Sequence, residues 1–286
     1  MRPGLLRCAL AVVLYLLLYA PVPAYTAEPL IMGVYPRADV KANYKLFQPI
    51  ANYLSKKLQR EVRMDVTDDF NSFWKAVENG YYDIVHYNQY HYIISQKHFG
   101  YIVILKNEEN GSPKIAGAIA VRKDSNIQSV ADLKGKKIVF GGGNKAMMGY
   151  ILPRYLLLQE GLGEGDYIES FAENATRAVI AATLKKDAAA QAGVTVVYAS
   201  EQTNQSAEQN LRILVQSEPI AQAPWAVKKN LSAKWIAQIK QTMLTLNQTA
   251  DGKTILRTAR LTGIAPADDA DFNPHREIAK YVFGDH

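Results

Sequence analysis

Short apolar runs alternate with four-residue hydrophobic repeats along the first hundred residues of the chain. Residues 30–34 are apolar and end just before Pro36, a pattern typical of a buried strand. The next segment predicts one buried face of a helix, which carries Leu46, Ile50, Leu54 and Leu58. Further strands are expected at 62–66, 83–85 and 101–105, and helices at 70–77 and from Gln89 onward. Strands alternating with helices indicate a parallel sheet covered by helices.

A second unit repeats this rhythm beyond residue 115. Its expected strands are 115–121, 137–140, 167–171, 194–198 and 211–215. A short helical turn is expected at 129–133, with helices at 145–159 and 176–185. The chain then returns to the first unit with a helix that carries Leu231, Trp235, Ile239 and Met243, and a docking helix at 274–283. Crossings near residues 116 and 218 predict two hinged lobes, with 25–116 plus 218–286 in lobe 1 and 117–217 in lobe 2.

The first 24 residues have the order of a secretory signal peptide. Arg2 and Arg7 precede an apolar run from residue 8 to residue 20, and Val22-Pro23-Ala24 resembles a cleavage site. The run is shorter than the roughly 20 residues of a membrane-spanning helix. The only cysteine, Cys8, follows Arg7 rather than a small residue, so no lipid anchor is expected. We therefore predict a periplasmic protein without disulfides or thiolate chemistry.

Composition and motifs argue against nucleic-acid binding and against catalysis. The formal net charge is +6, but the lysines and arginines are dispersed rather than grouped into basic blocks. The sequence has no nucleophile elbow, metalloprotease helix or P-loop. Asp68-Asp69 and Asp268-Asp269 are interpreted as helix-capping or loop acids rather than acid/base pairs. We expect no enzyme activity, no cofactor and a monomer.

Five short motifs follow one another along the chain: Gly33-Val34-Tyr35-Pro36-Arg37, Gly80-Tyr81-Tyr82-Asp83-Ile84-Val85, Val121-Arg122-Lys123-Asp124-Ser125, Asp132-Leu133-Lys134-Gly135-Lys136-Lys137 and 149–153. In their order and spacing the chain resembles the periplasmic phosphate/phosphite/phosphonate-binding proteins of ABC importers. The resemblance covers nearly the whole chain after residue 24. It implies an α/β, two-lobed type II periplasmic-binding fold, in which each lobe is a mostly parallel sheet flanked by helices. It also implies that a small molecule binds between the lobes and passes to a membrane permease.

The residues that contact ligand in that family are largely replaced here. A Ser-Thr-Ser at a helix start binds the phosphonate oxygens in the family, and the matching positions are Ala146, Met147 and Met148. The family's histidine falls at Asn174, its aspartate at Ala223 and one tyrosine at Ile115, whereas the other tyrosine is kept as Tyr87. Losing three hydrogen bonds to a charged group corresponds to roughly 10³- to 10⁶-fold in affinity. We therefore expect a ligand other than a phosphonate.

Ligands of open α/β sheets bind at the carboxyl ends of the strands. The loops expected to face the ligand are therefore those at 35–39, 86–91, 141–148, 173–176 and 219–225. The ligand-binding residues expected from these loops are Tyr87, Asn88, Gln89, Lys145, Ala146, Met147, Met148 and Asn174, with Tyr35, Ile115 and Ala223 as wall. The glycine-rich loop at 141–144 is either an anion site or a simple strand-to-helix turn. Tyr87 is either part of the pocket or a packed core residue.

Two further alternatives stay open. Met147 and Met148 are either core residues or, together with His86 and His91, ligands of a copper-like metal ion. Aromatic side chains near Asn88 and Gln89 suit an organic ligand equally well, and the histidine spacing does not require a metal. The partner is either the permease of an ABC importer or, in a sensor, a receptor kinase. Gene neighbours would separate these two functions, because the sequence does not.

Overall fold

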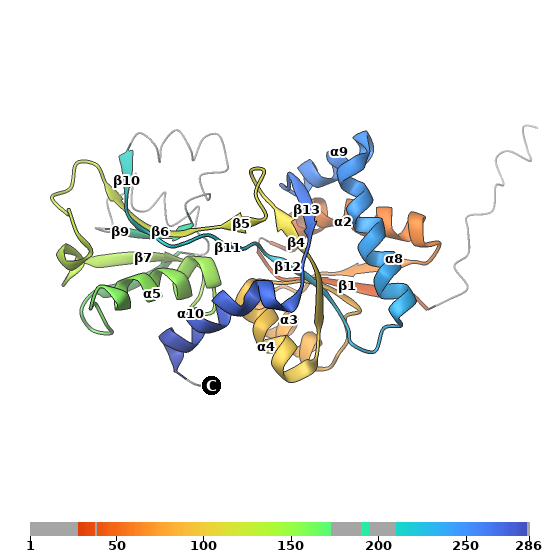
Figure 1. Cartoon of the computed structure of the whole chain (residues 1–286), viewed down its shortest axis with the longest axis horizontal. Coiled ribbons are helices and arrows are strands. Elements are labelled where there is room, and N and C mark those ends of the chain that lie inside the picture. Colours follow the sequence, from red (N-terminus) through yellow and green to blue (C-terminus); the bar gives the residue numbers. More distant parts are fainter. Residues whose placement is uncertain (1–27, 38, 173–189, 195–209, 285–286) are drawn as a thin grey trace, which may run out of the picture.

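Two β-sheets lie end to end along the long axis of the molecule, and a short pair of strands connects them (Figure 1). The structure is a computed structural model that describes residues 28–37, 39–172, 190–194 and 210–284. The predicted signal peptide and the predicted helix at 176–185 therefore lie outside the described residues.

The first sheet has the strand order β13-β4-β12-β3-β1-β2. Its strands are β1 (Leu30–Val34), β2 (Val62–Asp65), β3 (Ile84–His86), β4 (Ile102–Glu108), β12 (Pro224–Val227) and β13 (Gly263–Pro266). β1 pairs in parallel with β2 and β3, whereas β12 is antiparallel to both β3 and β4. The chain thus inserts a late strand, β12, between two early strands. The first sheet is complete only when residues beyond 220 return to it.

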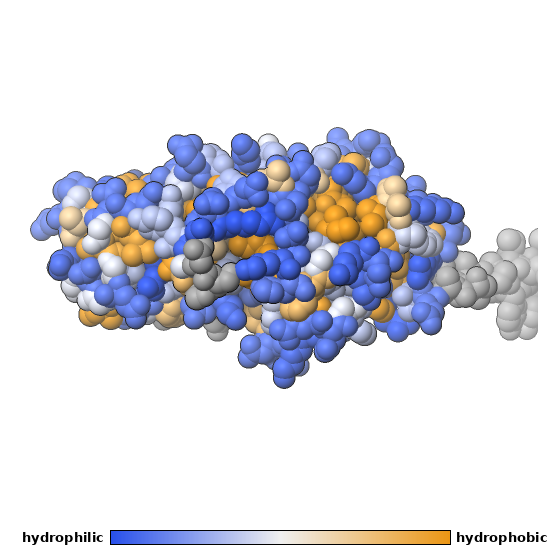
Figure 2. Space-filling view, turned by 60° about the horizontal axis from the view of Figure 1, so that its bottom comes forward, coloured by the Kyte–Doolittle hydropathy of each residue, from blue (hydrophilic) through white to orange (hydrophobic). Residues whose placement is uncertain are grey.

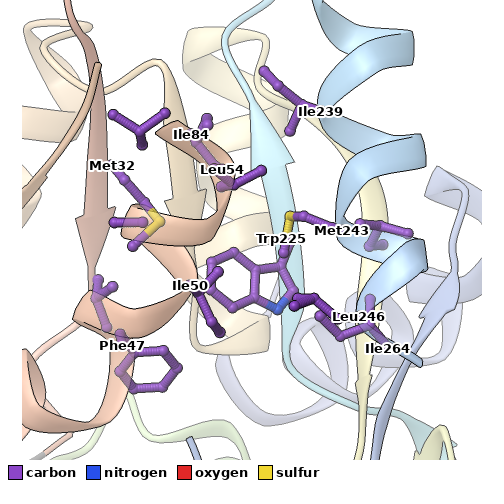
Figure 3. Close-up of a cluster of buried hydrophobic side chains, with 14 of the residues drawn as sticks. Met32, Phe47, Ile50, Leu54, Ile84, Trp225, Ile239, Met243, Leu246 and Ile264 are labelled. Carbon is purple, nitrogen blue, oxygen red and sulfur yellow. The ribbon is translucent and has the colours of Figure 1, made fainter. Parts of the chain in front are cut away.

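Helices cover both faces of this sheet (Figure 1). They are α2 (Val40–Leu58), α3 (Phe70–Glu78), α4 (Gln89–Phe99), α8 (Ala233–Leu244) and α9 (Ala250–Thr258), with a 3-10 turn at Thr245–Gln248. α2 begins at Asp39, whose carboxylate accepts a hydrogen bond from the Ala42 backbone N–H at 2.9 Å. Side chains of β1, α2, β12 and α8 meet around Trp225 in a fully buried cluster (Figure 3). The expected four-residue repeat of α2 faces this cluster.

The second sheet has the order β10-β6-β9-β7-β8. Its strands are β6 (Gly117–Arg122), β7 (Lys137–Gly141), β8 (Ile168–Ala172), β9 (Ala190–Val194) and β10 (Leu211–Gln216). β7 pairs in parallel with β8 and β9, and β6 is antiparallel to β9 and β10. α5 (Leu152–Gln159) packs on this sheet, and a 3-10 turn lies at Val130–Leu133. Each sheet therefore has a parallel core. The returning chain supplies the antiparallel strands of the first sheet, whereas β6, the strand that enters the second lobe, is the antiparallel strand of the second sheet.

Two antiparallel strands carry the chain between the sheets. β5 (Lys114–Ile115) leads into the second lobe, β11 (Ile220–Ala221) leads back, and Ile115 lies opposite Ile220. Ser217 and Gly117 hold the start of the second lobe together, because each backbone N–H bonds to the other residue at 2.9–3.0 Å. The only backbone connections between the sheets within the described ranges are these two crossing segments.

The C-terminal helix α10 (Asn273–Phe283) contacts both lobes. It follows a 3-10 turn (Asp269–Phe272) and packs against α4 of the first lobe and α5 of the second (Figure 1). Tyr281 of α10 contacts Tyr155 of α5 with ring centroids 5.2 Å apart, and Phe283 of α10 contacts Tyr90 of α4 at 5.7 Å. In the view of Figure 2 most of the surface is hydrophilic, with hydrophobic areas exposed on both lobes.

Several sequence expectations differ from the structure. The helix expected at 145–159 begins as a π-turn (Met147–Ile151), in which Ile151 N–H donates to the Ala146 carbonyl at 3.0 Å. Pro153 has no N–H to bond the Gly149 carbonyl, and this gap interrupts the regular α-helical ladder. The expected strand at 194–198 is described only at its first residue, which ends β9. β12 and β13 were not predicted, because runs of four residues beside proline carry no clear period. The nine-residue helix α9 was also not predicted.

The expected open loop at 219–225 is instead occupied by β11 and the start of β12. Backbone pairing explains the difference, since Gln222 N–H donates to the Pro113 carbonyl and Asn107 N–H donates to the Ala223 carbonyl, both at 3.0 Å. Of the acids at 68–69 and 268–269, Asp69 and Asp268 cap helical segments, which is one of the two roles expected for these residues. Asp69 accepts from two backbone N–H groups of α3, and Asp268 accepts from the Asp271 N–H.

Gly149 should be irreplaceable, because a Cβ built there would lie 1.7 Å from the carbonyl oxygen of Gly141. We predict that Gly149→Ala destabilises the second lobe by several kcal/mol, as other severe backbone clashes do. Gly143→Ala is the control, because a Cβ there meets nothing within 4 Å. Thermal unfolding should separate the two variants, and equal melting temperatures would contradict the close approach of the π-turn to β7.

Candidate functional site

The carboxyl ends of β1, β3 and β7 bring residues of the two lobes together. Tyr35 follows β1 and donates its backbone N–H to the carbonyl of His86, the last residue of β3, at 3.1 Å. Lys145 comes from the loop after β7 in the other lobe. Its ammonium lies close enough to His91 that its charge, after the larger effect of burial, helps lower the pKa of that histidine to about 3. This region, where residues of the two lobes approach one another, is the candidate site.

A buried polar network lies under the end of β3. Trp225 Nε1–H donates to Asn107 Oδ1 at 2.9 Å, and Asn107 Nδ2 contacts His86 Nε2 at 3.2 Å and Glu109 Oε1 at 3.3 Å. The His86 ring stacks on Trp225 with centroids 4.3 Å apart. Burial lowers the pKa of His86 well below its ordinary value, and the charge of Arg37 lowers it further. His86 is therefore neutral.

Arg37 adds a guanidinium to this side of the site. It lies 5.9 Å from the ring centroids of both Tyr35 and Phe47. Its pKa is raised by the neighbouring Tyr35 hydroxyl, an effect that burial opposes and Glu109 reinforces. The ion pairs found among the described residues do not include Arg37. Sequence reasoning missed Arg37 as a site residue, although its position three residues after the end of β1, in a loop expected to face the ligand, was an available signal.

Aromatic rings line the neighbouring surface around His91. His91 packs against Phe70 in a tilted arrangement with centroids 4.2 Å apart, and it meets Trp74 and Tyr90 edge-on at 5.4 Å and 5.8 Å. Phe70 also contacts Tyr35 at 6.4 Å, so the ring surface continues toward Arg37. Tyr35, Phe70 and Tyr90 are only partly buried. A flat, apolar part of a ligand would find contact area here.

Tyr87 lies on the opposite side of β3 from His86, as strand alternation requires. Its side chain is fully buried and meets Phe73, Tyr92 and Tyr101 at 5.7–6.3 Å. Among the described residues no hydrogen bond of acceptable geometry is found for the hydroxyl, and the nearby Ser95 hydroxyl donates to the Tyr92 carbonyl at 3.0 Å. In this structure Tyr87 occupies the packed-core position rather than the pocket position.

The two polar residues after β3 have different surroundings. Asn88 is the N-cap of α4 and its side chain accepts from the Tyr90 N–H at 3.0 Å, so its oxygen is engaged in the protein. Gln89 is 4 % exposed, and no hydrogen bond is found for its side chain among the described residues. Gln89 is therefore the better placed of the two to bind a ligand.

The residues of the loop after β7 differ in how deeply they are buried. Lys145 is exposed, Ala146 is partly buried at the N-cap of the π-turn, and Met148 packs at the margin of the second core. Met147 is fully buried within that core. The sequence placed Met148 more firmly in the core than Met147, and the reverse is true because the π-turn changes which residue faces the sheet. Met147 is thus a packing residue.

The remaining expected wall residues belong to the hinge. Ile115 and Ala223 are buried at 7 % and 6 % exposure, on β5 and just before β12. Next to Ala223, the amide nitrogen of Gln222 is buried without a partner. Asn174 lies outside the described residues. A surface hollow of about 610 Å³ lined by residues such as Arg122, Asp132 and Lys136 lies at the far end of β6, away from this site.

The metal alternative gains no support from the geometry. His86 packs against Phe47 and Trp225, whereas His91 packs against Phe70 and Trp74. Within the part of the chain that the structure describes, no group of three or more His, Cys, Asp or Glu residues is arranged to hold a metal ion. The two histidines are instead neutral imidazoles in separate aromatic environments.

Solved structures of binding proteins share this architecture. A Xanthomonas citri protein bound to chloride ion matches with a TM-score of 0.78, 17 % identity, and coverage of 90 % of this chain and 98 % of that chain. PhnD1 from Prochlorococcus marinus in complex with methylphosphonate matches at 0.77 and 17 % identity, covering 90 % and 99 %. A binding protein component of an ABC phosphonate transporter from Pseudomonas aeruginosa matches at 0.74 and 16 % identity, covering 88 % and 85 %.

The fold is therefore that of the type II periplasmic binding proteins, as the sequence predicted. Residues 32–272 also match the family described as ABC transporter, phosphonate, periplasmic substrate-binding protein. The chain belongs to this family, whose members bind substrates for transport rather than convert them. No helix in the described ranges is long and apolar enough to cross a membrane.

Tyr87→Phe should leave the fold intact or stabilise it slightly, because the hydroxyl is buried without a partner. Tyr92→Phe is the matched comparison, since that hydroxyl donates to Asp269 at 2.7 Å. We predict a loss of about 1–3 kcal/mol for Tyr92→Phe and none for Tyr87→Phe, measured by chemical denaturation. If Tyr87→Phe costs as much as Tyr92→Phe, its hydroxyl is bonded after all.

Buried neutral histidines should make the protein sensitive to mild acid. Burial lowers the pKa of His91 and of His275, which lies in α10, to about 3. In the unfolded chain these groups bind protons below about pH 6.5. Each therefore removes up to about 1.4 kcal/mol of stability per pH unit as the pH falls from 6.5 toward 3.

The test is the slope of unfolding free energy between pH 6.5 and 5. His275→Gln should flatten this slope by about one proton, because it removes the imidazole that binds a proton only in the unfolded chain. Glutamine can still donate to the Ala221 carbonyl, which His275 Nε2 contacts at 3.1 Å. The exposed His98, changed to Gln, is the control and should leave the slope unchanged. Identical slopes in both variants would mean that His275 is protonated in the folded protein.

Proposed function

We propose that this protein captures a small organic anion between its two lobes in the periplasm and delivers it to the permease of an ABC importer. The lobes of the proposal are residues 25–116 plus 218–286 and residues 117–217, hinged at β5 and β11. The transported molecule differs from the phosphonates that its relatives bind.

One observation carries the proposal: cations from the two lobes face the same group of aromatic residues. Arg37 lies beside Tyr35 in the first lobe, and Lys145 of the second lobe influences His91. A bound anion would satisfy both charges, and drawing the lobes together around it would be a hinge closure. β5 and β11 support such a motion, because only short strand pairs connect the sheets.

A ligand other than a phosphonate follows from the loop after β7. Ala146 and Met148 provide no hydroxyl, and Met147 is buried in the core.

The contacts of α10 with both lobes constrain the hinge motion, since opening of the lobes must slide or break the Tyr155–Tyr281 packing. The pocket proposed here comprises Tyr35, Arg37, Phe70, His86, Gln89, His91 and Lys145.

The test uses full-length protein expressed with its leader and purified from the periplasm. Native mass spectrometry should find a retained small molecule, and X-ray scattering should show a smaller radius of gyration before that molecule is stripped than after. Lys145→Gln should lose the retained mass, and Lys136→Gln, an exposed lysine elsewhere in the second lobe, should keep it. An unchanged radius of gyration, with no retained mass in any preparation, would refute capture between the lobes.

A further inference from the structure

The hydrogen bonds under β3 fix the position of the proton on His86. Trp225 Nε1 is only a donor, so Asn107 must present its carbonyl oxygen to it and its NH₂ group to His86. His86 Nε2 therefore accepts a hydrogen bond. Since His86 is neutral, its proton sits on Nδ1.

That Nδ1–H is a buried donor without a partner. The His86 side chain is 0 % exposed, and Nδ1 has no hydrogen-bond partner in the described structure. Leaving a buried donor unsatisfied costs about 1–3 kcal/mol, a cost that a binding site accepts when a ligand later supplies the acceptor. The His86 ring contacts the ring of Tyr35, a half-buried residue just after β1, with centroids 5.4 Å apart.

Arg37 provides the matching charge at the same place. Its guanidinium is near enough to His86 to influence the imidazole, and it lies over the faces of Tyr35 and Phe47 rather than in an ion pair. Glu109 also acts on Arg37, but no ion pair joins them, and Asn107 donates to the Glu109 carboxylate. The five N–H groups of Arg37 are therefore available in part to an external acceptor.

We infer that Arg37 and the Nδ1–H of His86 bind the carboxylate group of a monoanionic ligand, whose apolar body lies on Tyr35 and Phe70. The inference rests on the proposed function and specifies its ligand class. A guanidinium binds the two oxygens of a carboxylate side by side, and one further N–H completes the group. The partly buried rings that continue to His91 provide the apolar surface.

Two features favour a carboxylate over a phosphate or phosphonate. A tetrahedral anion presents three oxygens, and the hydroxyl positions that would bind them are Ala146, Met147 and Met148. The Glu109 carboxylate, close enough to act on Arg37 and Tyr35, opposes a second negative charge. A carboxylate fits both conditions, because it is planar with two oxygens and carries a single negative charge.

The experiment titrates ligand-free protein with benzoate and acetate, and with methylphosphonate and inorganic phosphate, by calorimetry and by tryptophan fluorescence. Trp225 reports on the site because it stacks on His86. Benzoate should bind more tightly than methylphosphonate or phosphate, and more tightly than acetate because acetate has no ring. Arg37→Gln should weaken benzoate binding at least tenfold. Arg63→Gln removes the same charge from an exposed position and should change it less than twofold.

His86 is tested by two replacements and by nitrogen-15 NMR of the wild-type imidazole. Glutamine places its amide near the former Nε2 and loses the Nδ1 donor, whereas asparagine places an NH₂ near the former Nδ1. Benzoate affinity should fall with His86→Gln and be better kept by His86→Asn, with unfolding curves recorded for both. If either variant does not fold, the NMR result and Arg37→Gln decide.

Three results would overturn the inference: a proton on Nε2, equal effects of Arg37→Gln and Arg63→Gln, or tighter binding of methylphosphonate than of benzoate. The same measurements distinguish failure of the carboxylate site from failure of the proposed capture between the lobes. A retained mass with lobe closure but no carboxylate binding would leave capture between the lobes standing. Arg37-dependent benzoate binding without any closure would support the carboxylate site and refute the hinge.

Discussion

The insertion of β12 into the middle of the first sheet is the constraint on which the site depends. Trp225 sits on that strand opposite His86 on one side and Leu105 on the other. Its indole N–H fixes the orientation of Asn107, and Asn107 in turn fixes the acceptor side of His86. The same ring is the centre of the apolar cluster that joins the sheet to α2 and α8 (Figure 3). Core packing and site chemistry are thus set by one residue.

The electrostatic character of the site follows from where each charge is buried. Histidines that would be half charged near neutral pH are held neutral by desolvation, and two of them flank the aromatic surface. The charges that remain are Arg37 and Lys145 on the two lobes, with Glu109 behind Arg37. In the proposed closure of the lobes, the two cations would move toward one bound anion.

Family membership and ligand identity rest on different parts of the chain. The match over residues 32–272 rests on sheets, crossings and turns, which are constrained by packing and hydrogen bonding. Ligand contacts are made by a few side chains on the loops between these elements, and such positions change without cost to the fold. Such a change would account for Ala146, Met147 and Met148 at the positions where the resemblance places hydroxyl groups, while the π-turn beside them keeps Gly149 against the Gly141 carbonyl.

Sequence alone determined the alternation of strands and helices, the two crossings and the family, because these depend on local periodicity and on short ordered motifs. It did not place β12 and β13, whose four residues become strands only through pairing with β3 and β4. Nor could it separate His86 from Tyr87, adjacent residues that strand alternation sends to opposite faces of one sheet. The tertiary structure decided that Tyr87 fills a core and that His86 meets Trp225 and Arg37, residues far apart in the chain. Long-range pairing, which no local pattern encodes, selected the side chains at the site.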